Sequence, residues 1–380
     1  MRPLTINGKF LSAGPTGVHR AAEELVRAID AEIASAAERS ERAPRANLLV
    51  PPDARTLSGL RAIETRTVPG ATGQRWEQVV LPRAVRGTVL LNLCNLGPLA
   101  VRDALTLVHD AMFVTSPSSY PRAFRWKYRA FVPLLARVHR AVMTVSEHSR
   151  TELARLGICP PERCHVVHNG CDHLARAPIA HDALARFGLE GTRYVLALAS
   201  SVPRKNVAVL LEAFARAAPD GARLALFGPD SRDALAAAGL AVPASTRVLG
   251  RVSDAELRAL LRGAHAFAFP SLDEGFGLPP LEAMAEGCPT VVAPRAALPE
   301  VCADAALYAD PHDAAEWSRR FAELEDPGRR GALVRRGRDR AARFDWGSSA
   351  RRILELARRV DADGASFGRG AGARAGALGT

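Results

Sequence analysis

Lysine and long apolar runs are both scarce in this sequence. Only Lys9, Lys127 and Lys205 are lysines among 51 basic residues, so arginine carries nearly all of the positive charge. No apolar run approaches the ~20 residues that a membrane-spanning helix needs, and the first residues pass directly into polar Asn7 and Gly8. We therefore expect neither a membrane span nor a secretory signal, and we predict a cytoplasmic protein.

Acidic residues are also too few to balance the basic ones. The formal net charge is +11 and the pI is about 10.1. A strong positive field attracts anionic partners, which include phosphorylated small molecules, acidic membrane surfaces and nucleic acid. Charge alone does not choose among these three classes.

Cysteine is not abundant enough for a disulfide framework, since six cysteines serve 380 residues. The run from Cys159 to His173 does concentrate cysteine and histidine, as a zinc site would. However, Val166 and Val167 are typical of a strand interior, which sends neighbouring side chains to opposite faces, and paired Cys-x2-Cys ligands are absent. We expect no metal site here.

The length and the hydrophobic pattern predict two α/β domains. A chain of 380 residues exceeds a single domain of ~100–200 residues. Short, continuously apolar runs alternate with amphipathic helical stretches, which is typical of parallel sheets covered on both faces. The predicted strands are Leu4–Ile6, Val89–Leu93, Leu105–His109, Ala141–Val145, His165–Val167, Tyr194–Ala199, Leu224–Phe227, Ala266–Phe269 and Thr290–Ala293.

Helical spacing of apolar residues supports the same organisation. One predicted face runs from Val18 to Ile33, and another from Val207 to Phe214. The pattern restarts near Tyr194 after the polar stretch 172–190, which we interpret as an interdomain linker. We predict domains at 1–172 and 173–360. The Gly- and Ala-rich segment 361–380 lacks periodicity, so we predict a disordered tail there.

Two adjacent cations stand between a predicted strand and a predicted helix. Arg204 and Lys205 follow Pro203 and precede the helix at Val207. Cations are unfavourable by ~0.3–1 kcal/mol at the N-terminus of a helix, so this pair indicates a compensating anion such as a diphosphate. The alternative is a solvated helix start whose charges point outward.

A second loop, Ser271–Met284, follows the strand that ends at Phe269. Ligands bind at strand C-termini in open α/β sheets, and Gly275 and Gly277 allow close approach of the backbone. Glu274 is predicted in the loop and Glu282 on the helix beyond, so the two carboxylates could bind two sets of hydroxyl groups. Glu282 also suits a first helical turn for purely structural reasons.

These motifs together resemble the C-terminal domain of the retaining glycosyltransferases of family four. Glu274 and Glu282 are separated by seven residues and lie upstream of a Gly-Cys-Pro-Thr-Val-Val strand, which is similar to that family's hallmark. Arg204-Lys205-Asn206 resembles its Arg-Lys-Asn motif. Further matches are Asn169-Gly-Cys-Asp172, Phe344-Asp-Trp346 and, more loosely, Thr16-Gly17-Val18, His109-Asp110 and Thr144-Val-Ser-Glu147. The resemblance covers roughly residues 1–360.

The resemblance implies a GT-B fold, in which two Rossmann-like domains have parallel sheets that face each other across a cleft. The last helix in this family can cross back to the N-terminal domain. The implied substrate is a nucleotide diphosphate sugar, and the implied activity is hexosyl transfer, with mannose as one candidate, to a glycan or lipid-linked acceptor in cell-surface polysaccharide synthesis.

The same resemblance assigns roles to individual residues. Arg204 and Lys205 would hold the donor diphosphate, Glu282 would bind the ribose, and Glu274 would face the transferred sugar. Gly275, Phe276, Gly277 and Leu278 would border it through their backbone. Gly17 would let the N-terminal domain reach the diphosphate, and His109 would contact the sugar. Ala199 and Val202 depart from the family, which usually has glycine and an acidic residue there.

No Asp-x-Asp pair lies where a divalent metal would bridge the phosphates, so we predict transfer that needs no metal or other cofactor. We expect no nucleic-acid partner, since no recognised motif accompanies the charge. The basic and aromatic run Tyr120–Arg129 is either an ordinary packed helix or a patch for a membrane surface. A peripheral position at the inner face of the membrane therefore stays open. The alternatives are a sugar-nucleotide epimerase or phosphorylase on the same scaffold and, from another class, a nucleic-acid-binding protein.

Overall fold

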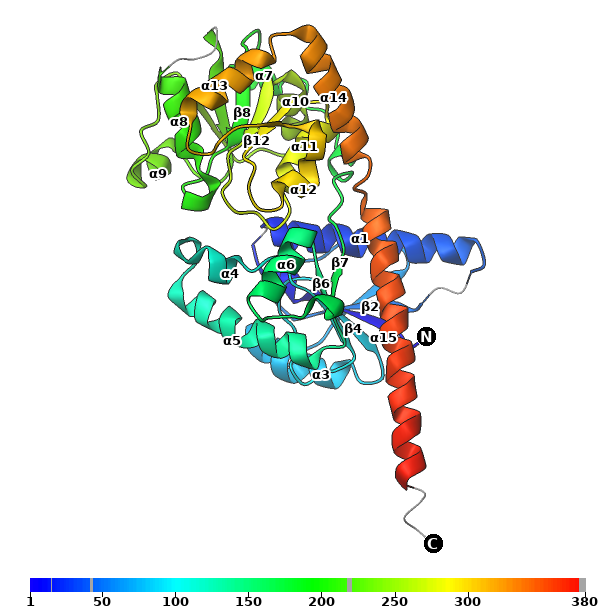
Figure 1. Ribbon diagram of the computed structural model, residues 1–380. Helices are drawn as coiled ribbons and strands as arrows, with labels where there is room; N and C mark the ends of the chain where they lie inside the picture. Colours follow the sequence, from blue (N-terminus) through cyan, green and yellow to red (C-terminus); the bar gives the residue numbers. More distant parts are fainter. Residues whose placement is uncertain (15, 42–43, 217–220, 376–380) are drawn as a thin grey trace. The chain divides into compact units, whose positions relative to one another are not determined.

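The computed structural model describes residues 1–14, 16–41, 44–216 and 221–375, without the side chains of 364–375. The chain divides into two compact units (Figure 1). Unit 1 comprises residues 1–111, 122–169 and 346–380, and unit 2 comprises residues 112–121 and 170–345. The division after Asn169 lies close to the predicted domain boundary, and the C-terminal helix belongs to unit 1, as the resemblance allowed.

Unit 1 contains a seven-stranded parallel sheet in the order β3-β2-β1-β4-β5-β6-β7. The first strand of the chain, β1, lies inside the sheet between β2 and β4, and all four of its residues are buried. The strands are β1 Leu4–Asn7, β2 Ala46–Val50, β3 Ile63–Thr67, β4 Val89–Asn92, β5 Ala104–Leu107, β6 Ala141–Thr144 and β7 Cys164–Val166.

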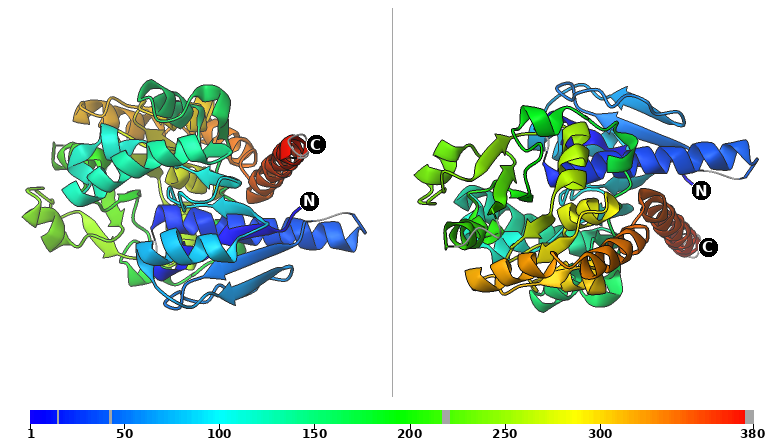
Figure 2. Two further views of the ribbon diagram at one scale, coloured as in Figure 1. Left: turned by 90° about the horizontal axis from the view of Figure 1, so that it is seen from below. Right: turned by 90° about the horizontal axis from the view of Figure 1, so that it is seen from above.

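Helices cover this sheet. The predicted face from Val18 to Ile33 is confirmed as part of α1, which packs against α15 within unit 1 (Figure 1). Arg2 donates to Asp361 at 2.7 Å, and both views of Figure 2 place the N-terminus beside α15. The helices are α1 Gly17–Glu38, α2 Gly73–Arg75, the π-helix η2 Trp76–Val80, α3 Leu81–Ala84, α5 Arg122–Val138, α6 Glu147–Arg155 and α15 Trp346–Ala375, with 3-10 turns η1 Gly8–Ser12 and η4 Pro161–Arg163.

Unit 2 contains a six-stranded parallel sheet in the order β10-β9-β8-β11-β12-β13. Its central strand β8 pairs with β9 and β11, and Trp317 and Phe321 fill the core beside it. The strands are β8 Tyr194–Leu198, β9 Arg223–Phe227, β10 Arg247–Gly250, β11 Ala266–Phe269, β12 Thr290–Val292 and β13 Leu307–Tyr308.

The helices of unit 2 include α8, which confirms the second predicted helical face. The α-helices are α4 Met112–Thr115, α7 Ala183–Arg186, α8 Val207–Arg216, α9 Arg232–Ala237, α10 Asp254–Gly263, α11 Leu278–Ala285, α12 Leu298–Cys302, α13 Ala314–Glu323 and α14 Pro327–Ala341, and the 3-10 turns are η3 Pro117–Ser119, η5 Leu174–Arg176, η6 Pro203–Lys205 and η8 Ala303–Ala305. None of the described helices is long and apolar enough to cross a membrane.

Two sequence predictions differ from the structure. The stretch 172–190 is no free linker, because Leu174, Ala183 and Leu189 are buried in unit 2. The tail predicted as disordered from residue 361 continues α15 as far as Ala375, and 376–380 lie outside the described residues. Alanine and arginine are strong helix formers, and the sequence analysis gave too much weight to the glycines between them.

Candidate functional site

The turn that carries the two adjacent cations is fixed by Asn206. It follows η6 in the left-handed conformation, with φ 52° and ψ 36°, which asparagine tolerates better than most residues. Its side-chain amide donates to the carbonyls of Pro270 at 3.2 Å and Pro311 at 2.8 Å. The turn after β8 is thereby joined to the loops that follow β11 and β13.

Glu274 lies at the centre of the predicted site. Its Oε1 accepts hydrogen bonds from Lys205 Nζ at 2.5 Å, Arg204 Nη1 at 3.3 Å and Ser271 Oγ at 2.5 Å. The residue is only 8% exposed. The structure therefore brings together Arg204, Lys205 and Glu274, which the sequence placed in two loops about seventy positions apart.

The electrostatics of this cluster favour an anion. Burial alone would raise the pKa of Glu274, but the charges of Lys205 and Arg204 outweigh it and lower that pKa overall, so the carboxylate is ionised at neutral pH. Two cations and one carboxylate leave one positive charge in excess within the cluster. Arg204 Nε is buried and has no hydrogen-bond partner among the described residues. A buried unsatisfied donor is costly, and an anionic ligand would satisfy it.

The loop between β11 and α11 is held against the same turn. The backbone N–H of Leu272 donates to the Arg204 carbonyl at 2.7 Å. Gly277 has φ 103°, and a Cβ there would lie 2.6 Å from Leu298, so glycine is required. Phe276 is buried and packs edge-on against Phe344, with ring centroids 5.7 Å apart. Gly275 comes directly before Phe276, and Leu278 is the first residue of α11.

The loop also has contacts that the sequence analysis missed. Asp273 Oδ2 accepts from Thr115 Oγ1 at 2.9 Å and from Ser116 Oγ at 2.6 Å. Residues 112–121 belong to unit 2 although the chain on either side of them belongs to unit 1. A short hydroxyl-rich segment carries no sequence signal for such a long-range contact.

Glu282 is separated from this cluster by its position on α11 and has a partner of its own. Its Oε1 bonds to His173 Nε2 at 2.9 Å, and both residues are buried. The turn before His173 is anchored because the N–H of Cys171 donates to the Phe344 carbonyl at 2.9 Å. The sequence analysis placed His173 in a possible metal cluster and missed this pairing.

Two predicted residues, Gly17 and His109, belong to unit 1. Gly17 is the first residue of α1, after Thr16, whose side chain does not cap the helix. His109 follows β5 and is buried, with Nε2 2.9 Å from the Leu93 carbonyl. Burial lowers the pKa of His109 to about 4, so the ring is neutral at neutral pH. Nε2 therefore donates to the carbonyl. The contact predicted between His109 and the sugar stays a prediction.

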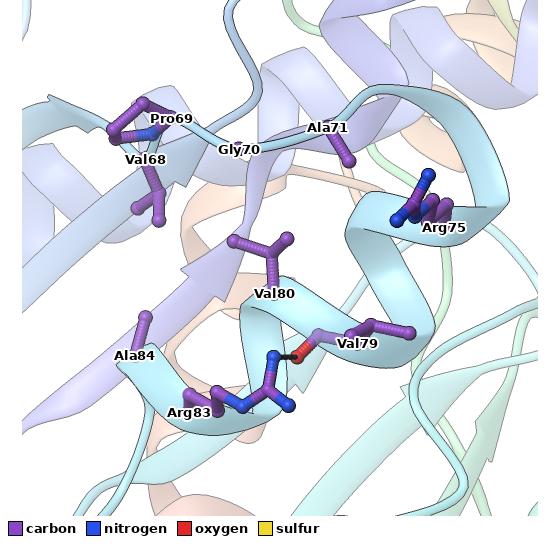
Figure 3. Close-up of a pocket in the computed structure, with 9 residues that line it drawn as sticks. All are labelled: Val68, Pro69, Gly70, Ala71, Arg75, Val79, Val80, Arg83 and Ala84. Atoms are coloured by element: carbon purple, nitrogen blue, oxygen red, sulfur yellow. Dashed lines mark hydrogen bonds between the residues drawn. The ribbon is translucent and has the colours of Figure 1, made fainter.

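The Cys- and His-rich run has free thiols at Cys159, Cys164 and Cys171. Within the described residues, no three His, Cys, Asp or Glu side chains form a group that could hold a metal ion. Unit 1 also has a cavity of about 520 Å³ between the loop after β3 and the η2–α3 helix, lined by Val68, Ala71, Val80 and two arginines, Arg75 and Arg83 (Figure 3). It contains none of the predicted site residues.

Comparison with known proteins places this geometry in a family. The family model for glycosyl transferases group 1 matches residues 184–340, which include both loops of the site. O-antigen chain mannosyltransferase B of Escherichia coli is 33% identical over 66% of this chain and 68% of its own length. The MMP alpha-(1->4)-mannosyltransferase of Mycolicibacterium hassiacum is 31% identical over 80% of this chain and 75% of its own.

Solved structures agree on the fold. HepE from Anabaena, in complex with UDP and glucose, has a TM-score of 0.73 at 17% identity and covers 94% of this chain and 99% of that one. WaaG, a glycosyltransferase involved in lipopolysaccharide biosynthesis, has a TM-score of 0.65 at 16% identity, with 93% and 99% coverage. The expected architecture of two Rossmann-like α/β domains is confirmed. This chain belongs to the group 1 glycosyltransferases and has their GT-B fold.

Proposed function

We propose that this glycosyltransferase moves a hexose, with mannose as the first candidate, from a nucleotide diphosphate sugar to a glycan or lipid-linked acceptor. The reaction retains the anomeric configuration and needs no metal. The names of the two relatives above support mannose, and the O-antigen relative supports a role in cell-surface polysaccharide synthesis. The UDP and glucose in the HepE complex support a nucleotide-sugar donor.

One observation carries the proposal: Arg204 and Lys205 surround a single buried carboxylate, and Arg204 keeps a buried donor without a partner. A diphosphate would satisfy that donor and balance the excess charge. Because the cluster is already held in place by Asn206 and Ser271, little reorganisation accompanies the reaction.

In the proposed mechanism these cations stabilise the leaving group. The bond between the anomeric carbon and the β-phosphate oxygen breaks, and its electron pair goes to the diphosphate. The acceptor oxygen forms the new bond on the same face of the sugar, and its proton passes to the departing diphosphate. Arg204 and Lys205 neutralise the charge that develops there, which is the task a divalent metal has in other enzymes.

The carboxylates have separate tasks in this proposal. Glu274 positions the two cations and faces the transferred sugar, so it needs no covalent bond to it. Glu282 binds the ribose hydroxyls through Oε2, since His173 occupies Oε1. The backbone of residues 275–278 borders the donor.

The proposal is tested by turnover with defined donors. The protein is incubated with GDP-mannose or UDP-glucose and methyl α-mannoside, in EDTA and in Mg²⁺, and nucleoside diphosphate release is measured. We expect release in EDTA, and a product whose anomeric configuration matches the donor by NMR. Turnover that appears only with Mg²⁺ would reject the metal-independent mechanism. Isomerised donor would support an epimerase, and phosphate-dependent cleavage would support a phosphorylase.

A further inference from the structure

Helix α5 of unit 1 presents a stripe of exposed cationic and apolar side chains. We define this α5 stripe as Arg122, Trp126, Arg129, Leu134 and Arg137, all of which are exposed. At 3.6 residues per turn they share one side of the helix. Trp126 is 76% exposed and Leu134 is 42% exposed, and both are among the large hydrophobic residues that the fold leaves in solvent.

Helix α5 is attached to unit 1 through its C-terminal half. Val132, Leu135 and Ala136 are buried on the opposite side. Phe124 and Tyr128, one turn apart and both half-buried, stack with their ring centroids 4.0 Å apart. The C-terminal part of α5 is therefore anchored in unit 1 by one face, whereas residues 122–131 are exposed or half-buried, and the α5 stripe is the exposed face of the whole helix.

The sequence that contains the stripe has charge of one sign only, although Arg140 forms an ion pair with Asp103 and Lys127 lies near Glu77. No acidic residue occurs in the sequence between Asp110 and Glu147. The same interval contains six cationic side chains: Arg122, Arg125, Lys127, Arg129, Arg137 and Arg140. Exposed arginines elsewhere in the chain commonly have an acidic neighbour, as Arg66 does in Glu64 and Arg216 in Glu212.

We propose that the α5 stripe binds an anionic lipid surface. Arginine side chains near the surface attract anionic headgroups. Tryptophan prefers the membrane–water interface, where its ring is shielded and its N–H is hydrated, and leucine adds shallow apolar contact. Single-stranded RNA is less well matched, because it is bound by several aromatic rings that stack on successive bases, and the stripe has one.

This inference goes beyond the proposed transfer reaction and uses none of its residues. It would place unit 1 at a membrane, where a lipid-linked acceptor is found. If the α5 stripe does not bind lipid, the proposed donor site is not affected. If the donor site is not where we propose, lipid binding by the α5 stripe is not affected either.

Tryptophan fluorescence of the full chain tests the contact directly. Of the four tryptophans, Trp76, Trp317 and Trp346 are buried, so a change on vesicle binding reports Trp126. We expect a blue shift with vesicles of phosphatidylcholine and phosphatidylglycerol, quenching when the lipid chains are brominated, and neither with phosphatidylcholine alone. Trp126→Phe should remove both signals. An unchanged spectrum with anionic vesicles, or a shift that persists in Trp126→Phe, would overturn the proposal.

Vesicle sedimentation with matched variants tests the charge. Arg122→Gln/Arg129→Gln should lower binding to the anionic vesicles roughly tenfold or more at low salt. Arg61→Gln/Arg66→Gln removes the same charge from unit 1 at side chains that are each 62% exposed, and it should bind as the wild type does. If both double variants lost vesicle binding equally, net charge alone would explain the binding, and the α5 stripe would be rejected as the binding surface. Binding to poly(U) that depends on the stripe, without vesicle binding, would replace lipid by RNA as the partner.

Discussion

The two units share one local arrangement, a lysine in a 3-10 turn that binds a buried glutamate, but the surroundings of that pair differ. In each, the first strand of the sheet along the chain (β1 or β8) is followed by a 3-10 turn whose lysine binds a buried carboxylate: Lys9 with Glu77 at 2.7 Å in unit 1, and Lys205 with Glu274 at 2.5 Å in unit 2. In unit 1 the remaining donors to Glu77 are neutral amides from Asn7 and Gln74. In unit 2 the cluster has a second cation, because Arg204 also donates to Glu274.

The two clusters differ in their charge balance and in whether every buried donor has a partner. Lys9, Glu77 and the two amides balance to no net charge, although Lys127 lies close enough for its charge to interact with Lys9 and with Glu77. Arg204 adds a positive charge and a buried N–H that lacks a partner in the described structure. An unbalanced cluster costs free energy in the empty protein, and a diphosphate would remove that cost.

The largest effect should come from Lys205→Ala. It removes a cation beside the leaving group, and we expect kcat/KM to fall ~10²–10³-fold, while the unfolding transition changes little because Arg204 still neutralises Glu274. Steady-state assays with the active donor measure this. Arg216→Gln, at a side chain 69% exposed on α8, serves as the control and should keep full activity. Activity of Lys205→Ala within a few-fold of wild type would contradict the assignment.

The equivalent change in unit 1, Lys9→Met, should act on stability. It leaves the 2% exposed Glu77 without its cation, and we expect a loss of about 3 kcal/mol in the free energy of unfolding. Urea denaturation measures it. The double variant Lys9→Met/Glu77→Gln should recover most of the loss, because no buried charge then remains. A double variant as unstable as the single one would show that the charge is not the cause.

Acid should destabilise unit 1 through its neutral histidines. Burial lowers the pKa of His109 and of His139 to about 4. The unfolded chain binds protons near pH 6.5 that the folded state excludes, so stability is full above 6.5 and falls as the pH drops toward 4. Each histidine contributes about 1.4 kcal/mol per pH unit in this window. Denaturation between pH 7 and 4 should show the slope, and His139→Gln should reduce it; an identical slope would exclude His139.

A smaller effect is expected from His173→Ala, which frees Glu282 to rotate. Binding of a nucleoside diphosphate should weaken about tenfold, while its 2′,3′-dideoxy analogue should bind as before, since ribose hydroxyls are what Glu282 is proposed to hold. Calorimetry with both ligands measures this, and His173→Gln should restore part of the affinity. Equal weakening of both ligands would indicate a structural defect instead.

The smallest effect should come from Ser253→Ala in unit 2. Ser253 caps α10 in a reciprocal capping box with Glu256, and its loss should cost about 1 kcal/mol of unfolding free energy. Turnover at 25 °C should not change. This variant shows how far unit 2 can lose stability without losing function, and a fall in kcat would mean that the two are linked.

Nine of the thirteen described strands were predicted, among them the edge strand β7. The four that were missed are the edge strands β3, β10 and β13 and the interior strand β2, in which four of five residues are buried. β8, β9, β11 and β12 are short apolar runs, so hydrophobicity identifies them. β3 was missed because four of its five residues are exposed and polar, as an edge strand allows, and β13 has only two residues.

The residues of the candidate site were also predicted only in part. The resemblance identified Arg204, Lys205 and Glu274, and the structure brings them together. It gave no indication of His173 beside Glu282, nor of Thr115 and Ser116 at Asp273, because these contacts join residues more than a hundred positions apart. Long-range contacts follow from packing, which no local pattern encodes.

The central claim is that Arg204 and Lys205 bind a diphosphate. The most direct measurement is calorimetric titration of wild-type protein and Lys205→Ala with the tightest-binding of UDP, GDP and ADP, and with its parent nucleoside, all in EDTA. We predict that the variant loses at least tenfold in affinity for the diphosphate and nothing for the nucleoside. Equal affinity of both proteins for the diphosphate, or an equal loss for both ligands, would contradict the claim.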